Sequence, residues 1–421
     1  MRKLIFLNRF YAPDHSATSQ ILTDLVHRLE LNDAELHVVT SRLSYDGGRV
    51  EEPFDEYANG IQIHRLWTST FGRRNLLGRA LDYLSFYASS FFRLMKLVRA
   101  GDIVVAKTDP PMISVIAAGV TRLKRARLVN WLQDIFPEVA RALGLGFSND
   151  FLFGAARSLR NWSLKKAEKN IVLGEVMAEH LRSEGIDVAT IDIIPNWVVG
   201  GGLAPIDKAT NPLVREWGLQ DSFVVGYSGN LGLAHDHATI IAAVRALGDR
   251  KDIHFLFIGG GGGFDILRRV VEDEHLGNVS FHPYQPIERL SESLSTADVH
   301  LVTLEPALEG YIVPSKFYGV LAVNRPILYV GSASGEIGAQ VTTHGLGDVV
   351  EIGNSTELVQ LIEHLAGSAE ACRQRADRVR AWQAANSAGE RSVERWRRLL
   401  SGLLPEATES KQLARAEGKP Q

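Results

Sequence analysis

The chain has 421 residues, of which 45% are hydrophobic and 23% charged, with a formal net charge of −3. This length favours two domains, and the small net charge gives no reason to expect nucleic acid as a partner. The single cysteine, Cys372, excludes an internal disulfide and fits a reducing compartment such as the cytoplasm, while the lack of 18 consecutive apolar residues excludes a clear membrane span.

The first half of the chain alternates short apolar runs with longer periodic segments. The runs predict buried strands at 4–7, 35–40, 103–106, 127–131 and 169–173. Periodic segments such as 19–29 and 112–123 predict the helices between them. This order of elements indicates a parallel sheet built from βαβ units. The apolar start at 4–7 is too short for a signal peptide and is interpreted as the first buried strand.

The loop after this first strand has neither the Gly-x-Gly-x-x-Gly of a dinucleotide site nor the Gly-Lys-Ser/Thr of a phosphate loop. The sequence therefore argues against a nicotinamide dehydrogenase and a P-loop kinase. Gly-x-Ser-x-Gly is also absent, which argues against a serine hydrolase. No group of His, Cys, Asp and Glu has metal-ligand spacing, so we expect no metal site.

Segment 73–99 is rich in Leu, Phe, Tyr and Ser, and its cationic residues outnumber its single acid, Asp82. The cations are Arg73, Arg74, Arg79, Arg93, Lys96 and Arg99. A basic amphipathic helix of this kind can lie on an anionic membrane face. We therefore expect a cytoplasmic protein that binds the inner membrane surface peripherally through this segment. The alternative is an ordinary surface helix whose aromatic residues pack on the domain.

A polar pair, Gln133 and Asp134, follows the predicted strand at 127–131 and precedes Pro137. Residues at the carboxyl ends of parallel strands border the ligand crevice of such a sheet. Asp134 is therefore a candidate for the chemistry, with a helix cap ahead of Pro137 as the alternative use.

A second series of strands and helices begins at 223, after a break rich in glycine and proline near 195–212. Strands are predicted at 223–227, 254–258, 279–282, 299–304 and 327–330, and helices at 237–247, 264–274, 287–296 and 356–365. Residues 368–404 also look helical, and the tail from 405 is polar. The fold class is thus α/β, with two Rossmann-like, doubly wound domains facing each other across a cleft.

Two glycine-rich turns end strands of the second half. The first, at 226–232, contains Gly229, and the second, at 259–263, contains Gly259 and Gly260. Small residues at a strand end let a ligand approach the backbone closely, although a tight packing turn would use them too. Because loops at the carboxyl ends of one sheet converge, both turns are expected at one crevice.

Pro314, Ser315 and Lys316 follow the strand at 299–304 and an acidic loop, and they open an apolar segment. This layout predicts a helix that begins at Ser315 and Lys316, beyond the carboxyl end of a strand. Free backbone N–H groups and the Lys316 charge would suit a phosphate there. Together with the glycine turns, the segment predicts a site for a phosphorylated ligand.

Further motifs lie at 194–197 (Ile-Pro-Asn-Trp), 255–261, 281–286 and 392–396 (Ser-Val-Glu-Arg-Trp). With them, residues 3–400 resemble the group 1 glycosyltransferases, which have the GT-B architecture. Segments 11–20 and 131–138 are similar to a subgroup from exopolysaccharide and O-antigen synthesis that includes the colanic acid glycosyltransferases. The resemblance implies a nucleotide-sugar donor, retention at the anomeric carbon, a lipid-linked glycan acceptor, and no metal or other cofactor.

The resemblance also implies roles for single residues. Donor-binding positions are Gly229, Asn230, His235, Gly259, Gly260, Tyr284, Gly310, Tyr311 and Ser315, and acceptor-side positions are Asp14, Ser16, Ala17 and Thr18. Lys316 would stabilise the leaving diphosphate, Asp134 would orient or deprotonate the acceptor hydroxyl, and Glu309 would hold sugar hydroxyls.

The chain departs from the family pattern around the donor. Asn230 and His235 stand where the family has arginine and lysine, which removes one or two cations from the diphosphate. Tyr311 and Gly319 stand where two glutamates are usual, and Glu309 is the candidate replacement for the first.

The expected domains are an acceptor-side domain at 1–198, a donor-side domain at 199–380, a returning helix at 381–404 and a polar tail at 405–421. A nucleotide-sugar epimerase of the same fold and a non-catalytic scaffold of a polysaccharide assembly complex remain as alternatives to the transferase.

Overall fold

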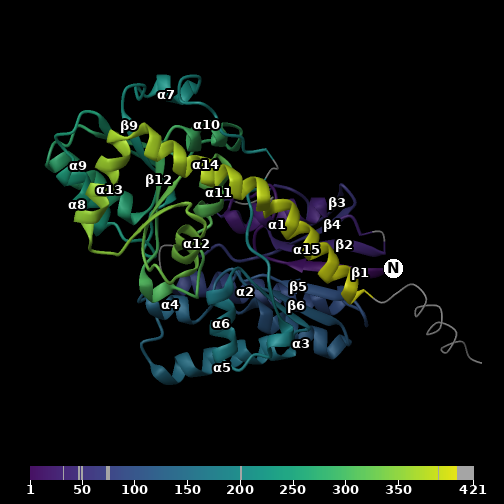
Figure 1. The fold of residues 1–421 in the computed structure, drawn as a ribbon. Coiled ribbons are helices and arrows are strands. Elements are labelled where there is room, and N and C mark those ends of the chain that lie inside the picture. Colours follow the sequence, from purple (N-terminus) through teal and green to yellow (C-terminus); the bar gives the residue numbers. More distant parts are fainter. Residues whose placement is uncertain are drawn as a thin grey trace, which may run out of the picture.

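The computed structural model describes residues 1–31, 33–45, 48, 51–72, 76–199, 202–386 and 388–404. These residues form two α/β domains, each with its own sheet (Figure 1). The basic pair Arg73 and Arg74 and the predicted polar tail lie outside the described residues. Within the described part of the chain, none of the helices combines the length and apolar character needed to cross a bilayer.

The N-terminal sheet has the strand order β3-β4-β2-β1-β5-β6-β7-β8. Its strands are β1 (Arg2–Leu7), β2 (Ala34–Ser41), β3 (Asp55–Ala58), β4 (Ile61–Leu66), β5 (Ile103–Ala106), β6 (Arg127–Trp131), β7 (Lys169–Val172) and β8 (Ile191–Ile193). All neighbours pair in parallel except β3 and β4, which form an antiparallel edge. The five predicted strands are confirmed, and β3, β4 and β8 are additions to them.

Helices cover both faces of this sheet. They are α1 (Ala17–Arg28), α2 (Leu76–Leu97), α3 (Ile113–Lys124), α4 (Glu138–Ala142), α5 (Asp150–Lys166), α6 (Glu175–Ser183) and the short η1 (Val188–Thr190). Helix α2 buries Phe86 and Leu94 against the sheet. Its opposite face exposes apolar residues at helical spacing, namely Leu77, Leu81, Leu84 and Phe92.

The C-terminal sheet is parallel throughout, in the order β11-β10-β9-β12-β13-β14. Its strands are β9 (Phe223–Asn230), β10 (Ile253–Gly260), β11 (Val279–His282), β12 (Val299–Thr303), β13 (Ile327–Val330) and β14 (Gly347–Val350). Its helices are α7 (Pro212–Glu216), α8 (Ala238–Ala246), α9 (Gly262–Asp273), η2 (Ile287–Arg289), α10 (Leu290–Ser295), η3 (Pro306–Leu308), α11 (Lys316–Ala322), α12 (Glu336–His344) and α13 (Ser355–Gly367).

The last two helices return the chain to the N-terminal domain. Helix α14 (Ala369–Asn386) lies along the C-terminal domain, and α15 (Ala388–Leu403) runs on across the N-terminal one (Figure 1). Trp396 on α15 is fully buried, and its ring lies 4.7 Å from that of Trp131 at the end of β6. This helix therefore contributes to the core of the first domain although it lies at the end of the chain.

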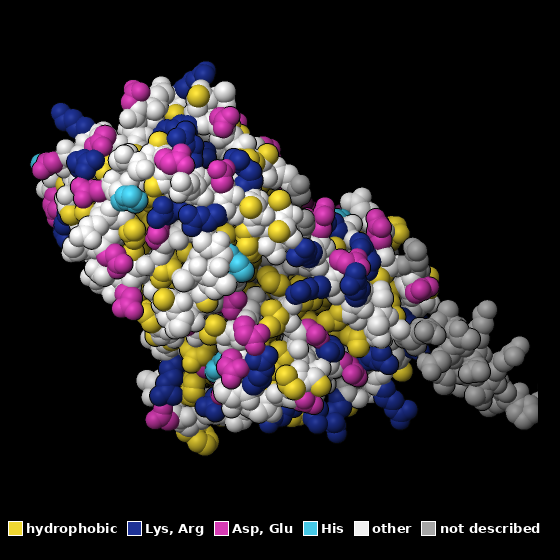
Figure 2. Space-filling view, in the orientation of Figure 1, with side chains coloured by type: hydrophobic (Ala, Val, Ile, Leu, Met, Phe, Trp, Pro, Cys, Tyr) yellow, Lys and Arg dark blue, Asp and Glu magenta, His cyan; other side chains and the backbone are white. Residues whose placement is uncertain are grey.

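The two domains also touch beside the cleft. The Ile135 N–H donates to the Tyr311 carbonyl at 2.8 Å, and Asp134 and Ile312 form an isolated antiparallel bridge. Farther along, the N–H of Val176, at the start of α6, donates to the Glu336 carboxylate of α12 at 3.1 Å. Hydrophobic side chains gather along the junction of the two lobes (Figure 2). The Ile135–Tyr311 hydrogen bond and the Asp134–Ile312 bridge hold the loop after β6 against the loop before α11.

Candidate active site

The glycine turns of the C-terminal domain pack backbone against backbone. Strands β9 and β10 stay in register as far as the pairs Gly229–Gly259 and Asn230–Gly260. A Cβ atom on Gly259 would lie 2.3 Å from the Gly229 carbonyl oxygen, and Gly259 has a φ of +133°. Both facts require glycine at 259, so this turn is fixed by packing and backbone conformation.

Lys316, the first residue of α11, extends its side chain over Gly229 toward the end of β9. Its Nζ donates to the Tyr227 hydroxyl at 2.5 Å and to the Asn230 carbonyl at 2.6 Å, and lies 3.1 Å from Nε2 of His235. A Cβ on Gly229 would approach the Lys316 Cε to 2.5 Å. The glycine at 229 therefore makes room for the lysine stem, which explains the Gly-Asn turn beside α11.

The partners of the Lys316 ammonium group are all neutral. His235 Nδ1 lies 2.6 Å from the Thr303 carbonyl and must donate to it, which leaves Nε2 as an acceptor facing Lys316. Burial lowers the pKa of Lys316 to about 7. Burial and the Lys316 charge lower the pKa of His235 to about 4. Among the described residues no carboxylate pairs with Lys316, so its charge is available to an anion.

Asp134 faces the same cleft from the N-terminal domain, in the loop after β6. Its side chain is open to the cleft, yet protein surrounds it on the other sides. Burial and the neighbouring Asp109 raise the pKa of Asp134 to about 6, and the charge of Lys107 opposes that rise. Lys107 itself is fully buried, and its Nζ donates to the Thr18 carbonyl at 3.1 Å. An accessible carboxylate with a pKa near neutrality suits proton transfer.

A cleft of about 450 Å³ lies between the domains and brings predicted residues from both of them together. The predicted residues that line it are Ala17, Thr18 and Asp134 on one side and Gly229, Tyr284, Ser315 and Lys316 on the other. Asn230 and His235 lie directly behind Lys316 and contact its ammonium group. The cleft therefore joins a cation, a carboxylate and an exposed aromatic ring, since Tyr284 is 62% exposed.

Other predicted donor residues lie at the domain junction and are not among those that line the cleft. Glu309 Oε1 accepts from the Tyr329 hydroxyl at 2.8 Å, and its Oε2 accepts from the Glu336 N–H at 3.3 Å, so this carboxylate caps α12. Gly310 packs against Val176 of the other domain. Tyr311 packs edge-on against His180, with 5.0 Å between ring centroids.

Two acceptor-side residues hold the loop between β1 and α1. The Asp14 carboxylate accepts hydrogen bonds from the backbone N–H groups of Ser16 (2.8 Å) and Tyr45. Ser16 is the N-cap residue of α1. Both side chains are buried, and only the following residues, Ala17 and Thr18, reach the cleft.

The structure adds contacts to which the sequence assigned no role, one of them made by Gln133, the polar residue expected beside Asp134. Gln133 and Asn196 exchange two side-chain hydrogen bonds of 3.1 and 2.8 Å across 63 positions, and both line the cleft. The Ser228 hydroxyl, buried and without a hydrogen-bond partner, lies beside Gly229. Lys107 follows strand β5 as Asp134 follows β6, so its position at a strand end was the available signal.

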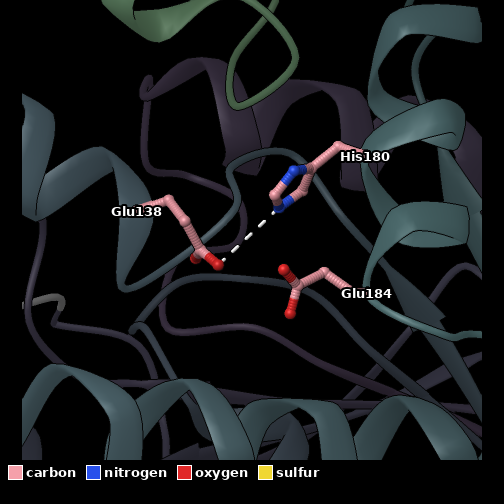
Figure 3. A group of neighbouring side chains, drawn as sticks. All are labelled: Glu138, His180 and Glu184. Atoms are coloured by element: carbon pink, nitrogen blue, oxygen red, sulfur yellow. Dashed lines mark ion pairs between the residues drawn. The ribbon is translucent and has the colours of Figure 1, made fainter.

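One group of side chains among the described residues has the proximity of a metal site. Glu138, His180 and Glu184 have potential ligand atoms within 4.8 Å of one another, and Glu138 and His180 form an ion pair (Figure 3). Arginines already hold both carboxylates: Arg160 pairs with Glu138 at 2.7 Å, and Arg157 with Glu184 at 2.7 Å. Since these guanidinium groups balance the charge, we assign the group to the packing of α4, α5 and α6.

Comparison with known proteins agrees with this geometry. A model of the glycosyl transferase 4-like domain matches residues 17–197. The probable glycosyltransferase WbjE of Pseudomonas aeruginosa is 25% identical over 70% of this chain and 73% of its own. The putative colanic acid biosynthesis glycosyl transferase WcaI of Escherichia coli is 25% identical over 80% of this chain and 85% of its own. The chain is thus similar to glycosyltransferases over most of its length, and its N-terminal part matches a glycosyl transferase domain.

Solved structures confirm the fold predicted for this chain. Anabaena HepE, solved in complex with UDP and glucose, superposes with a TM-score of 0.71 at 15% identity, covering 96% of this chain and 100% of that one. WaaG, a glycosyltransferase involved in lipopolysaccharide biosynthesis, gives 0.67 at 13% identity, covering 93% and 98%. At these identities the likeness shows the fold alone, which is the two-domain GT-B architecture.

Proposed function

We propose that this glycosyltransferase moves a sugar from a nucleotide-diphosphate sugar to a lipid-linked glycan, with retention at the anomeric carbon. We place the reaction at the cytoplasmic face of the inner membrane, in bacterial exopolysaccharide, capsule or O-antigen synthesis. The name of WcaI, a putative colanic acid biosynthesis glycosyl transferase, supports the pathway, and that of WbjE supports the transferase activity. The UDP and glucose bound to HepE support the donor class.

The observation that carries the proposal is the Lys316 ammonium group, which faces the cleft opposite Asp134 and has neutral partners. As the bond to the sugar breaks, negative charge grows on the leaving diphosphate. A fixed cation that meets this charge stabilises the transition state more than the ground state. Tyr227 and His235 hold the ammonium group in place, so little reorganisation is needed when the donor binds. The exposed ring of Tyr284 suits the nucleobase.

Asp134 supplies the other half of the proposed reaction. A carboxylate whose pKa is about 6 is ionised at neutral pH and can accept a hydrogen bond or a proton from an acceptor hydroxyl. Asp134 and Lys316 lie on opposite domains, so the two roles are separate. Lys316 contacts the leaving diphosphate, and Asp134 contacts the acceptor hydroxyl. The proposed reaction uses no metal: Lys316 takes the role that a divalent cation has in other transferases.

The exposed apolar stripe of α2 supports the membrane part of the proposal. Leu77, Leu81, Leu84 and Phe92 lie on one face of the helix and are 47–79% exposed. Sedimentation with anionic vesicles tests it. The double variant Leu77→Glu/Leu81→Glu should lose most vesicle binding, whereas Val188→Glu, a change at another exposed apolar residue, should keep it. Equal sedimentation of both variants would contradict a role for α2.

The donor is tested by binding and by product analysis. UDP, GDP and other nucleoside diphosphates are screened by thermal shift, because a ligand that binds only the folded state stabilises it. We expect one of them to raise the melting temperature and its sugar conjugate to be consumed only with an acceptor glycan. A new sugar nucleotide formed from the donor alone would instead favour the epimerase alternative, and no binding of any of them would contradict the proposal.

A further inference from the structure

A second pocket adjoins Asp134 inside the N-terminal domain. It has a volume of about 310 Å³ and is walled by α2, the start of α3, α4, the segment 145–147 and α5. Most of the lining is apolar, and it includes Tyr83, Met112, Phe136 and Phe147. Asp134 borders both this pocket and the cleft between the domains. The volume is at the lower end of the range for small-molecule sites, roughly 300–1,000 Å³.

The apolar pocket also contains cations. Arg79, Lys107 and Arg160 all contribute to its lining. Arg160 is only 4% exposed: its Nη2 donates to Glu138 at 2.7 Å, whereas its Nε and Nη1 are buried with no hydrogen-bond partner. Buried N–H groups of a charged side chain are rarely left without an acceptor. The two nitrogens would be satisfied by the oxygens of an anionic ligand.

Exposed apolar residues, here called the apolar rim, lie on the segments that wall this pocket. Leu77 and Leu81 flank the pocket residues Arg79 and Ala80 along α2, and both are exposed. On the other side Leu145 is 44% exposed, and Phe151 and Leu152 at the start of α5 are 81% and 57% exposed. An apolar rim around an apolar pocket with internal cations matches an amphiphile that carries a phosphate group.

We propose that this pocket binds the phosphate group and the first apolar carbons of the lipid that carries the acceptor glycan, with the Nε and Nη1 groups of Arg160 as phosphate donors. The proposal rests on the function proposed above and adds the site of the acceptor lipid and the phosphate group by which it is held. The rest of a long lipid chain would leave the pocket over the apolar rim into the bilayer. The acceptor sugar would lie toward Asp134, where the pocket meets the cleft.

The test is calorimetric binding of a short analogue, geranyl phosphate, to the full chain, compared with geraniol and with inorganic phosphate. We expect geranyl phosphate to bind at least tenfold more tightly than either compound. Two variants should weaken that binding at least tenfold: Ala80→Trp, which fills the mouth from an exposed helix position, and Arg160→Gln. Ala88→Trp, two turns farther along the exposed face of α2, is the matched control and should bind as the wild type does.

Several results would overturn the proposal. Equal binding of geraniol would show an apolar pocket without a phosphate site, and equal binding of inorganic phosphate would show a free-anion site. Equal affinity of Ala80→Trp and Ala88→Trp would place the ligand elsewhere, and this comparison remains valid if Arg160→Gln does not fold. Nucleoside-diphosphate binding is measured on every variant. If the wild type binds no nucleoside diphosphate, the proposed function is contradicted. If the wild type binds a nucleoside diphosphate but not geranyl phosphate, only the proposed pocket is contradicted.

Discussion

The two walls of the cleft carry opposite charges, and these charges differ in whether charged neighbours surround them. On the C-terminal wall the Lys316 ammonium group has only neutral partners. On the N-terminal wall Asp134 feels both the cation of Lys107 and the carboxylate of Asp109. Burial brings both pKa values toward neutrality, to about 7 for Lys316 and about 6 for Asp134. Lys316 has no counter-charge from the described residues, which suits the binding of an anionic ligand. The charge of Asp134 is partly balanced, which suits proton transfer.

Removing the cation should have the largest effect. In Lys316→Ala we expect the transfer rate to fall about 10²–10³-fold, because a donor aimed at developing negative charge is lost. Initial rates with saturating donor measure it, and circular dichroism confirms folding. The matched control is Lys251→Ala, an exposed lysine of the same domain, which should leave the rate unchanged. Full activity in a folded Lys316→Ala protein would contradict the assignment of the leaving-group cation.

Removing the Asp134 carboxylate should affect sugar transfer but not nucleotide binding. In Asp134→Asn we expect transfer to fall about 10²-fold, while the affinity for the nucleoside diphosphate selected in the thermal-shift screen stays within about twofold. The pKa of Asp134 is raised from 3.8 to about 6 in the folded state, so ionising this carboxylate costs stability; the cost grows from about pH 4 to about pH 6, is complete above pH 6 and vanishes in acid. Asp134→Asn should therefore melt higher than the wild type at pH 8 and level with it near pH 4. A parallel loss of nucleoside-diphosphate affinity would show that the carboxylate also contributes to donor binding.

The pH dependence of nucleoside-diphosphate binding should come from Lys316. In the free protein Lys316 loses its proton above about pH 7, whereas a bound diphosphate favours the charged form. Binding then takes up a proton, and the dissociation constant should rise by up to tenfold per pH unit above that point. Calorimetry in buffers of different ionisation enthalpy measures the proton uptake. Proton uptake on binding should disappear in Lys316→Met and persist in Asp134→Asn. Proton uptake that remains in Lys316→Met would show that another group titrates.

The smallest effect should come from the turn that makes room for Lys316. In Gly229→Ala the new Cβ meets the Lys316 stem at 2.5 Å, and the residue must keep a φ of +124°. We expect nucleoside-diphosphate affinity to fall about tenfold and stability to drop by about 1–3 kcal/mol. Gly262→Ala is the control, since nothing lies within 4 Å of a Cβ there. Unchanged nucleoside-diphosphate binding in Gly229→Ala would mean that the ammonium group can be placed without this turn.

The sheet strands divide into those that local pattern predicts and those that it does not. The central strands are buried on both faces and appear as continuous apolar runs, as in β5 and β13. Strands β3 and β14 have no such pattern. Strand β3 has the sequence Asp-Glu-Tyr-Ala and lies at an exposed edge, and β14 begins at Gly347. These two become strands because a neighbouring strand supplies their hydrogen bonds.

The site divides in the same way. Asp134, Gly229 and Lys316 were predicted because each is placed at a strand end or helix start by its own sequence neighbours. Glu309 was expected at the sugar, but its carboxylate caps α12, a contact set by a helix that begins 27 positions later. The unpaired nitrogens of Arg160 depend on where α5 meets α4.

The sequence by itself determined the two-domain α/β fold, the resemblance to glycosyltransferases and the cation at the start of α11, since these depend on periodicity and on short motifs whose residues stay together in the chain. Only the tertiary structure decided which charges are balanced. Lys316 meets Tyr227 and His235 from more than 80 positions away, and Asp134 meets Lys107 across two neighbouring strands. Burial and long-range pairing set pKa values and ligand access, and both arise only when the sheets and helices are packed.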